Sequence, residues 1–444
     1  MTNPSPRHGM SIRVLAMLVL PAVTWAAALT ARAGDSPAVP PPRAAGNQWS
    51  IALLPDPQGY NQTYDLGGWK GRGYQYKDRF PKQIEWIVSN IQTYNVRFAV
   101  ELGDSVQDYG FDPAKAATQP AGRDAKVRGE WLNAQAGIDL FHKDGDSQRA
   151  AVVPYAVVIG NHDYHTNSQG DLASQEYELF FGPGRWKTAE GKVKPAFADW
   201  FVGDDRGWRY EAGGQLKATG SGRNSCQVFT AAGRTFLHLT LECGATDQAI
   251  AWARSMLADH PGKPTIISIH GFIDGGGKIL AAERMGRQVK GPNPTNDGQQ
   301  IFDKLIKDND QIFLVFCGHM WSQKRVDLSN AKGNSVHVLE QCYHLDKAGG
   351  RIDTDEDPGD WIYKGPNDRD RNGSGWMTLL VFDPDRKTIT RYTYSPVLGA
   401  WATSKPADYD GRSFPKGDVI DRFEFDFDAR FGPASPTSKP AEAR

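Results

Sequence analysis

Each of five short apolar runs in this chain ends at an Asp, an Asn or a His. The runs are rich in β-branched residues, and the polar residues that follow them are Asp56, Asp104, Asn161, His270 and His319. Uninterrupted apolar runs of this length are typical of buried strands, and in α/β proteins such strands are usually parallel. We therefore expect the five polar residues to meet at the carboxyl edge of a sheet, where ligands bind in open α/β folds.

Helical patterns alternate with these runs over residues 50–320. Apolar residues recur at helical spacing in residues 79–94 and 246–259, which predicts a helix in each segment. After His319 the pattern changes to a succession of strand-like segments. These predicted strands cover residues 324–328, 335–341, 375–383, 387–395 and 419–427. The chain is therefore expected to be an α/β protein whose C-terminal part is mostly antiparallel.

Four long, polar, glycine-rich insertions interrupt this alternation. They cover residues 59–78, 183–223, 271–298 and 346–374. Loops of this length in a compact domain are usually functional or disordered. Several of them directly follow strands that end in a polar residue, which is the position of loops that border a functional site.

The first 33 residues have the order of segments found in a secretory signal peptide. Arg7 and Arg13 precede an apolar stretch, and an Ala31-Arg32-Ala33 site follows it. This order predicts general secretion, cleavage after Ala33 and an exported protein, periplasmic or extracellular. A retained membrane anchor is the alternative, although the apolar stretch is short and contains Pro21.

The remaining chain divides into three predicted parts with nearly balanced charge. Residues 34–47 are a proline-rich linker, residues 48–430 the folded domain and residues 431–444 a disordered tail. Removing residues 1–33 takes away three Arg and no acidic residue, which changes the formal net charge from −1 to −4. This dispersed charge carries no signature of nucleic-acid binding, and no later segment is long and apolar enough to span a bilayer.

Four cysteines permit two disulfides in an exported protein. Cys226 and Cys243 lie on what the pattern predicts to be an antiparallel strand pair, and Cys317 and Cys342 each lie at the end of an apolar strand. Buried free thiols are the alternative, since connectivity does not follow from the sequence.

The polar residues at the strand ends form a ligand set for hard or borderline divalent metals. A hydrolase with two metal ions needs a bridging carboxylate, further ligands for each ion and an acid for the leaving group. The candidate ligands are the carboxylates of Asp56 and Asp104, the amide of Asn161 and the imidazoles of His270 and His319.

Two further residues are candidates for catalysis. His162 and Asp163 directly follow Asn161. His162 can donate a proton to the leaving group, and Asp163 can hold the ring of His162. The alternative for the whole set is turn chemistry, since Asp and Asn cap helices after strands in any α/β protein.

Five short motifs in this order resemble those of the calcineurin-like metallophosphoesterase superfamily. They are Asp56-Pro57-Gln58, Gly103-Asp104, Gly160-Asn161-His162-Asp163, His270-Gly271 and Gly318-His319-Met320-Trp321. The resemblance covers roughly residues 50–400. Each dipeptide alone is weak, but all five at predicted strand ends make a specific signature.

The resemblance implies a four-layer α/β/β/α sandwich with two mixed sheets and long loop insertions. It also implies two divalent metal ions, drawn from Mn, Mg, Fe, Zn or Ca, that Asp104 bridges. Asp56 and Gln58 would hold the first ion, and Asn161, His270 and His319 the second. The implied reaction is the hydrolysis of a small-molecule or polymeric phosphate ester, monoester or diester, by a metal-bound hydroxide.

Two departures from the family pattern fall on the first metal position. Gln58 and Trp321 stand where the family has His, and Trp321 cannot ligate a metal. Asp56, Asp104 and Gln58 form an oxygen-rich set that favours Mg²⁺, Mn²⁺ or Ca²⁺ over Zn²⁺ or Fe³⁺. His344 is a candidate substitute ligand.

These departures leave two alternatives to phosphate ester hydrolysis. One is a degenerate, catalytically weak binding protein that keeps the fold and one metal ion. The other is an esterase for a non-phosphate ester. Among the remaining histidines, His238 and His337 lie within strand patterns and are predicted to be structural, whereas His165 is predicted to be a solvated loop residue.

Overall fold

The fold is described from a computed structural model that covers most of the chain. The described residues are 41, 43–62, 77–107, 110–165, 175–205, 207–210, 216–219, 222–285, 294–320, 323–342, 375–397, 399–401 and 421–434. The predicted signal peptide, most of the linker, most of the tail, Trp321 and His344 lie outside these residues.

The first of two large mixed sheets contains the strands that end near Asp56, Asp104 and Asn161. Its seven strands are β1 (Trp49–Leu54), β2 (Val96–Glu101), β3 (Tyr155–Val157), β13 (Met377–Asp383), β14 (Thr388–Ser395), β15 (Ala400–Trp401) and β16 (Asp421–Glu424). The order is β15-β14-β13-β1-β2-β3, and β16 also pairs with β14. Strands β1, β2 and β3 are parallel, whereas β13 and β14 are antiparallel to their neighbours.

The second sheet contains the strands that end near His270 and His319. Its seven strands are β4 (Phe201–Asp204), β7 (Ser225–Ala231), β8 (Arg234–Leu241), β9 (Thr265–Ile269), β10 (Ile312–Cys317), β11 (Gln323–Ser329) and β12 (Ser335–Gln341). The order is β11-β12-β10-β9-β8-β7-β4, with β8, β9, β10 and β12 parallel. A separate hairpin joins β5 (Gly207–Tyr210) to β6 (Leu216–Thr219).

The expectation that all five apolar runs share the edge of one sheet is wrong. Three runs form β1, β2 and β3 of the first sheet, and two form β9 and β10 of the second. The predicted later strands are present, but β12 also pairs in parallel with β10. The carboxyl ends of two parallel strand sets therefore meet where the two sheets face each other.

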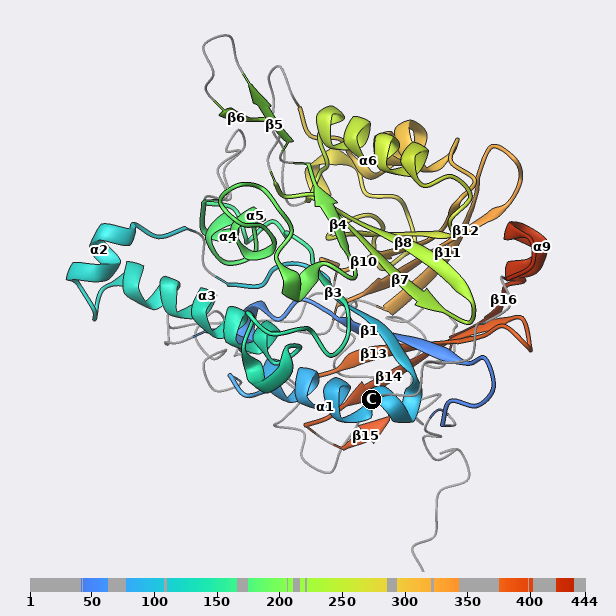
Figure 1. Ribbon diagram of the computed structural model, residues 1–444, viewed down its shortest axis with the longest axis horizontal. Helices are drawn as coiled ribbons and strands as arrows, with labels where there is room; N and C mark the ends of the chain where they lie inside the picture. The colour runs from blue at the N-terminus through green and yellow to red at the C-terminus, as the bar shows by residue number, and fades with distance from the viewer. Residues whose placement is uncertain are drawn as a thin grey trace, which may run out of the picture.

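The helices lie beside the sheets, and the two predicted from apolar spacing are confirmed (Figure 1). They are α1 (Arg79–Tyr94), α2 (Pro113–Thr118), α3 (Arg123–Asp139), α4 (Gln175–Phe180), α5 (Pro183–Trp186), α6 (Asp247–Asp259), α7 (Gly298–Ile301) and α9 (Phe427–Phe431). Helix α1 buries Phe80, Ile84 and Ile87 at helical spacing and ends at Asn95 in the left-handed region, φ 48°. The Thr246 side chain caps α6 by accepting a bond from Ala249 N.

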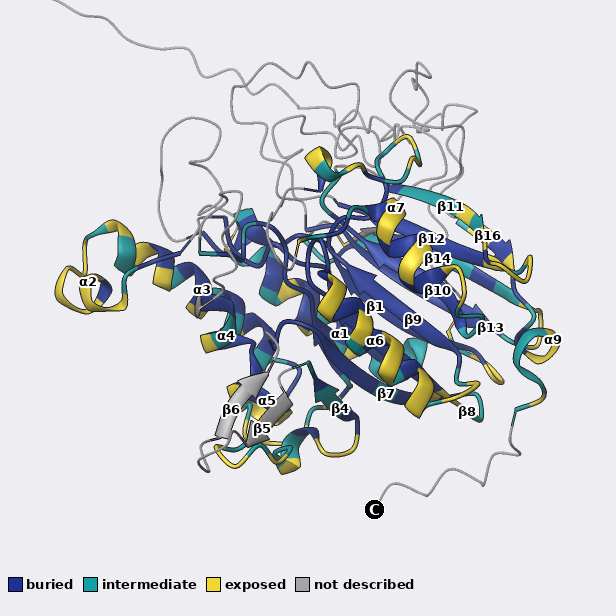
Figure 2. Ribbon diagram, turned by 90° about the horizontal axis from the view of Figure 1, so that it is seen from above, coloured by how far each residue is buried: buried dark blue, intermediate teal, exposed yellow. Residues whose placement is uncertain are grey.

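One apolar cluster lies between the two sheets and fixes how they face each other. It joins Ile51 and Phe98 of the first sheet to Phe236, Ile266 and other residues of the second. Residues on the opposite face of β1, Ala52 and Leu54, instead pack with α1 and α3. The burial pattern shows the central strands as the buried part of the molecule (Figure 2). The shared core therefore holds the strand ends of both sheets in register.

His238 is a structural residue in this core, as its strand pattern predicted. It is fully buried in β8, and its ring contacts the Gln227 Oε1 at 2.9 Å and the Ser268 Oγ at 2.8 Å. Burial lowers the pKa of His238 to about 3 because the charged ring would lose its hydration. His337 is also buried, with Nδ1 2.8 Å from Asp327 Oδ1.

We expect His238 to make the folding stability depend on pH. The pKa of His238 is higher in the unfolded state than in the folded state, so the unfolded state takes up the proton first as the pH falls. The free energy of unfolding therefore decreases between about pH 6.5 and about pH 3. The loss from this residue reaches roughly 5 kcal/mol at most. Urea unfolding of the wild type and His238→Gln between pH 7 and 4 should show a difference in unfolding free energy that changes with pH. The same substitution at half-buried His260 is the control, and a pH-independent difference for His238→Gln would contradict the prediction.

Candidate metal centre

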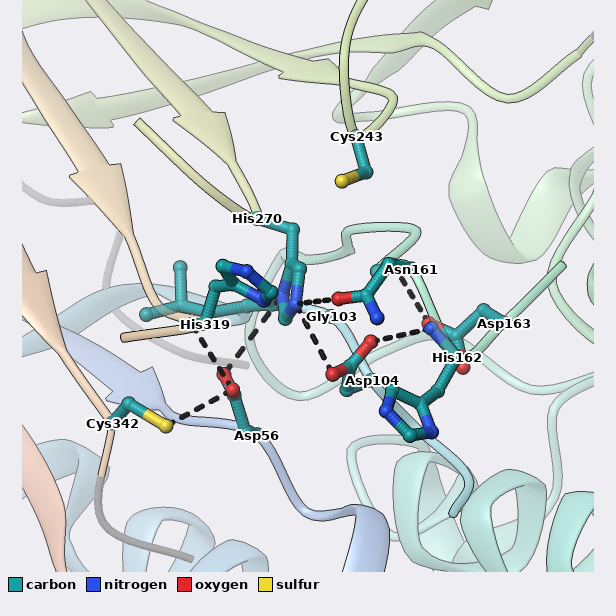
Figure 3. Close-up of polar contacts among 12 residues, drawn as sticks. Asp56, Gly103, Asp104, Asn161, His162, Asp163, Cys243, His270, His319 and Cys342 are labelled. Carbon is teal, nitrogen blue, oxygen red and sulfur yellow. Dashed lines mark hydrogen bonds and ion pairs between the residues drawn. The ribbon is translucent and has the colours of Figure 1, made fainter. Parts of the chain in front are cut away.

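Six polar side chains from both sheets converge at the meeting strand ends (Figure 3). Asp56 follows β1, Asp104 follows β2, and Asn161 and His162 follow β3, whereas His270 directly follows β9 and His319 follows β10. Four of the predicted ligands, Asp56, Asp104, Asn161 and His270, are at most 5 % exposed. The structure thus brings together residues separated by more than 200 positions in the chain.

His270 lies at the centre of this group. Its Nε2 is 3.2 Å from Asp104 Oδ2 and 3.0 Å from Asn161 Oδ1, and its Nδ1 is 4.0 Å from Asp56 Oδ1. One ligand atom each from Asp104, His270 and His319 lie within 4.8 Å of one another. These donors therefore have the spacing of a metal site.

Backbone carbonyls orient the rings of His270 and His319. His270 Nδ1 donates to Leu102 O at 2.9 Å, which leaves Nε2 facing Asp104 and Asn161. His319 Nε2 is 3.0 Å from the carbonyl of Arg284, so Nδ1 is the ring atom left for a ligand. A carbonyl that accepts one ring N–H fixes the tautomer and presents the other nitrogen, as in most protein metal sites.

The two aspartates differ in the direction of their pKa shifts. Burial raises the pKa of Asp56 to about 7, and the negative charge of Asp104 adds to the effect. Burial alone would also raise the pKa of Asp104, but the nearby His270 and His162 outweigh it and hold the pKa well below its usual range. Asp104 is therefore the permanently charged carboxylate of the site.

The pKa values of His270, which is buried, and of half-buried His319 shift in opposite directions. Burial alone would lower the pKa of His270, but Asp104 and Asp56 outweigh it and raise the pKa to about 10. Burial and the charge of His270 lower the pKa of His319 to about 4. The carboxylates thus stabilise one positive charge at the centre of the site, which a bound cation would supply after displacing the Nε2 proton of His270, whereas the His319 ring is neutral.

Glycines allow the loops to approach this closely. A Cβ atom on Gly160 would lie 2.1 Å from Asp104 N, and one on Gly318 would lie 2.3 Å from Asp56 Oδ1. Gly103 has a φ of 97°, which a residue with a side chain rarely adopts. Asp104 and His319 themselves have positive φ values, 54° and 71°, and such strain is often found at functional sites.

His162 is held beside Asp104, but Asp163 has a different role from the predicted one. The His162 backbone N donates to Asp104 Oδ1 at 2.8 Å, and its ring Nδ1 is 2.7 Å from Gln107 O. The carboxylate of Asp163 accepts bonds from Gly160 N at 2.8 Å and from Val106 N at 3.3 Å. The expectation that Asp163 holds the ring is therefore wrong, because a backbone carbonyl fills that position and Asp163 fixes the loops.

The predicted first metal position contains a residue that the sequence did not assign to it. Cys342 Sγ donates to Asp56 Oδ2 at 3.0 Å, and the same oxygen accepts a bond from His319 N at 3.0 Å. Gln58 is buried in the turn after β1. The signal for Cys342 was its place after β12, but only the parallel pairing of β12 with β10 brings that strand end to the site.

None of the four cysteines, all of which are described, forms a disulfide. Cys226, Cys243, Cys317 and Cys342 are buried free thiols. The Cys243 sulfur donates to Met285 O at 3.0 Å. Both pairings considered from the sequence are therefore wrong.

His165 does not join the central group in the described contacts. Its Nδ1 is 2.8 Å from the buried Glu176 Oε1, and its side chain is 40 % exposed. Glu176 also accepts a bond from Phe111 N. His165 is therefore a partly solvated loop residue that is tied to α4.

The comparisons with known proteins leave the family open. No family model matches the chain. It is 24% identical over 325 residues to the uncharacterized protein YvnB of Bacillus subtilis (strain 168), which covers 73% of this chain. The chain spans only 19% of the length of that protein.

Among solved structures, one match is GAP50, described as the anchor in the inner membrane complex of Plasmodium. The match covers 90% of this chain and 99% of that one, at 11% identity and a TM-score of 0.38. Within the described residues, no helix is long and apolar enough to cross a membrane.

Proposed function

We propose that the protein is an exported, metal-dependent phosphoesterase of the calcineurin-like class. The predicted leader sequence supports export. Two facing mixed sheets with helices packed beside them support the four-layer α/β/β/α sandwich of that class. The five sequence motifs support it further because their polar residues lie at strand ends around one site.

The observation that carries the proposal is the orientation of His270. A backbone carbonyl takes its Nδ1, and its Nε2 lies between Asp104 Oδ2 and Asn161 Oδ1 at 3.2 and 3.0 Å. Two oxygen atoms this close to one ring nitrogen also have the spacing of ligands that share a metal ion with that nitrogen. The pKa of His270, raised to about 10 by Asp104 and Asp56, supports a site that stabilises positive charge.

The residues present offer donors for two divalent ions. Asp104, His270 and His319, with Asn161 beside His270, would hold one ion with oxygen and nitrogen donors. Asp56 and Gln58, both buried, would hold the other. When bound, the ions supply Lewis-acid polarisation of the phosphoryl oxygens and lower the pKa of the attacking water. Gly160 and Gly318 allow the backbone to approach Asp104 and Asp56 closely, because a side chain at either position would clash with them.

His162 is placed to act on the leaving group. Its backbone N–H donates to Asp104, and Gln107 O anchors its ring through Nδ1. The other ring nitrogen, Nε2, would be the atom that acts on a substrate oxygen. The ring is half-buried, whereas Asp104 beside it is 3 % exposed. A proton at Nε2 would pass to the departing alkoxide or phenoxide.

An assay with defined ions and ester substrates tests the proposal. The metal-free protein is loaded with Mn²⁺, Mg²⁺, Ca²⁺ or Zn²⁺ and given p-nitrophenyl phosphate, bis-p-nitrophenyl phosphate and p-nitrophenyl acetate. We expect turnover of a phosphate ester with at least one ion. No phosphate turnover with any ion, together with less than one tightly bound ion per chain, would refute it and leave the degenerate binding protein. Turnover of the acetate alone would point to the non-phosphate esterase.

A further inference from the structure

The first metal position has a buried sulfur where the sequence pattern lacks its expected imidazoles. Cys342 Sγ lies 3.0 Å from Asp56 Oδ2, and both residues are fully buried (Figure 3). Two ligands of one tetrahedral zinc ion, with a sulfur at about 2.3 Å and an oxygen at about 2.0 Å, lie roughly 3.5 Å apart. The hydrogen-bonded Cys342–Asp56 pair therefore needs to open by only about 0.5 Å to hold one ion between its two ligand atoms.

Gln341, the residue before Cys342, gives a second, independent observation. It is fully buried, and both polar atoms of its side chain have no hydrogen-bond partner among the described residues. Leu339, two positions earlier in β12, packs in the cluster between the sheets, so Gln341 faces the same side. Its backbone oxygen lies 3.4 Å from the place of a Cβ on Gly318, and Asp56 Oδ1 lies 2.3 Å from that place. A buried amide without a partner is costly unless a ligand satisfies it.

The other cysteines have different surroundings. Cys226 and Cys317 pack in the apolar cluster on the α6 side of the second sheet. Cys243 bonds to a backbone carbonyl. Cys342 is the cysteine that the structure pairs with a carboxylate of the site.

We propose that Cys342 is a thiolate ligand of the first metal position, together with Asp56 and with the Gln341 amide oxygen beside them. On metal binding the Cys342 S–H bond breaks, its proton leaves to solvent, and the sulfur electron pair forms the bond to the ion. Because thiolate prefers borderline ions, this position would select Zn²⁺, Fe²⁺ or Co²⁺ over Mg²⁺ and Ca²⁺. The inference rests on the proposed function, and it replaces the oxygen-rich ligand set expected from the sequence.

Cobalt titration of the metal-free, full-length protein tests the inference. We expect a near-ultraviolet thiolate-to-cobalt charge-transfer band in the wild type and in the control Cys226→Ser. In Cys342→Ser the band should disappear, and bound cobalt should fall from about two ions to about one per chain. The inference is overturned if the wild type binds both ions without the band, or if Cys342→Ser keeps it.

X-ray absorption of the zinc-loaded wild type gives a second readout that needs no variant, so it does not depend on whether Cys342→Ser folds. We expect one sulfur scatterer at about 2.3 Å from zinc. Only nitrogen and oxygen scatterers would overturn the inference. Both measurements are made without substrate. A sulfur ligand found in a protein that turns over no phosphate ester would therefore support this inference while refuting the proposed function.

Discussion

Replacing Asp104 with Asn is expected to lower kcat/KM for phosphate esters by roughly 10³-fold, because the site loses its permanently charged carboxylate. Asn keeps an oxygen that can accept the bond from His162 N, so the loop geometry survives while the charge is lost. The loss should appear with every ion tested, since Asp104 lies against the central His270. Steady-state kinetics and metal content per chain, measured on the same preparation, check the prediction.

The control for Asp104→Asn is the same substitution at Asp303, an exposed residue of the short π-helix Phe302–Ile306 that follows α7. Asp303→Asn should change kcat/KM by less than about twofold, because exposed ion pairs contribute little. Thermal unfolding of both variants shows whether the fold is retained. A folded Asp104→Asn with near wild-type activity and metal content would contradict the role of Asp104.

Replacing His162 with Gln is expected to slow substrates with poor leaving groups by roughly 10²- to 10⁴-fold, the usual effect of losing a general acid. The reason is that an alkoxide leaving group needs the proton from Nε2, whereas p-nitrophenolate leaves without it. The loss should therefore be much smaller with p-nitrophenyl phosphate than with an alkyl phosphate. Kinetics over a series of leaving groups measures this difference directly.

His165→Gln is the matched control for His162→Gln. His165 lies three positions later and is also anchored through Nδ1, but to Glu176 on α4. We expect His165→Gln to change all substrates by a similar, small factor. An equal loss over the whole leaving-group series in His162→Gln would show that His162 positions the phosphoryl group and does not protonate the leaving oxygen.

Local patterns in the chain were enough to predict several parts of this fold. The apolar spacing of α1 and α6 predicted their bounds almost to the residue, because each helix buries one continuous stripe. The apolar runs predicted β1, β2, β9 and β10, because strands buried on both faces have no polar alternation. The positions of Asp56, Asp104, Asn161, His270 and His319 at strand ends followed from the same runs.

Contacts between distant segments decided what these patterns did not contain. Sheet membership depends on which strands pair, and the pairing of β12 with β10 joins segments separated by another strand. The partner of the His162 ring is a backbone carbonyl, which every residue carries and no sequence pattern marks. Asp163 therefore looked like the ring partner in the sequence, although it fixes the loops around Gly160.

The sequence by itself determined which candidate metal ligands lie at strand ends, because the distance from each apolar run to its polar residue is a local property of the chain. Only the tertiary structure decided that two sheets deliver them, that His270 stands among three of them, and that Cys342 lies against Asp56. The physical reason is that the cluster between the sheets sets the distance between strand ends, and that cluster draws its residues from both halves of the chain.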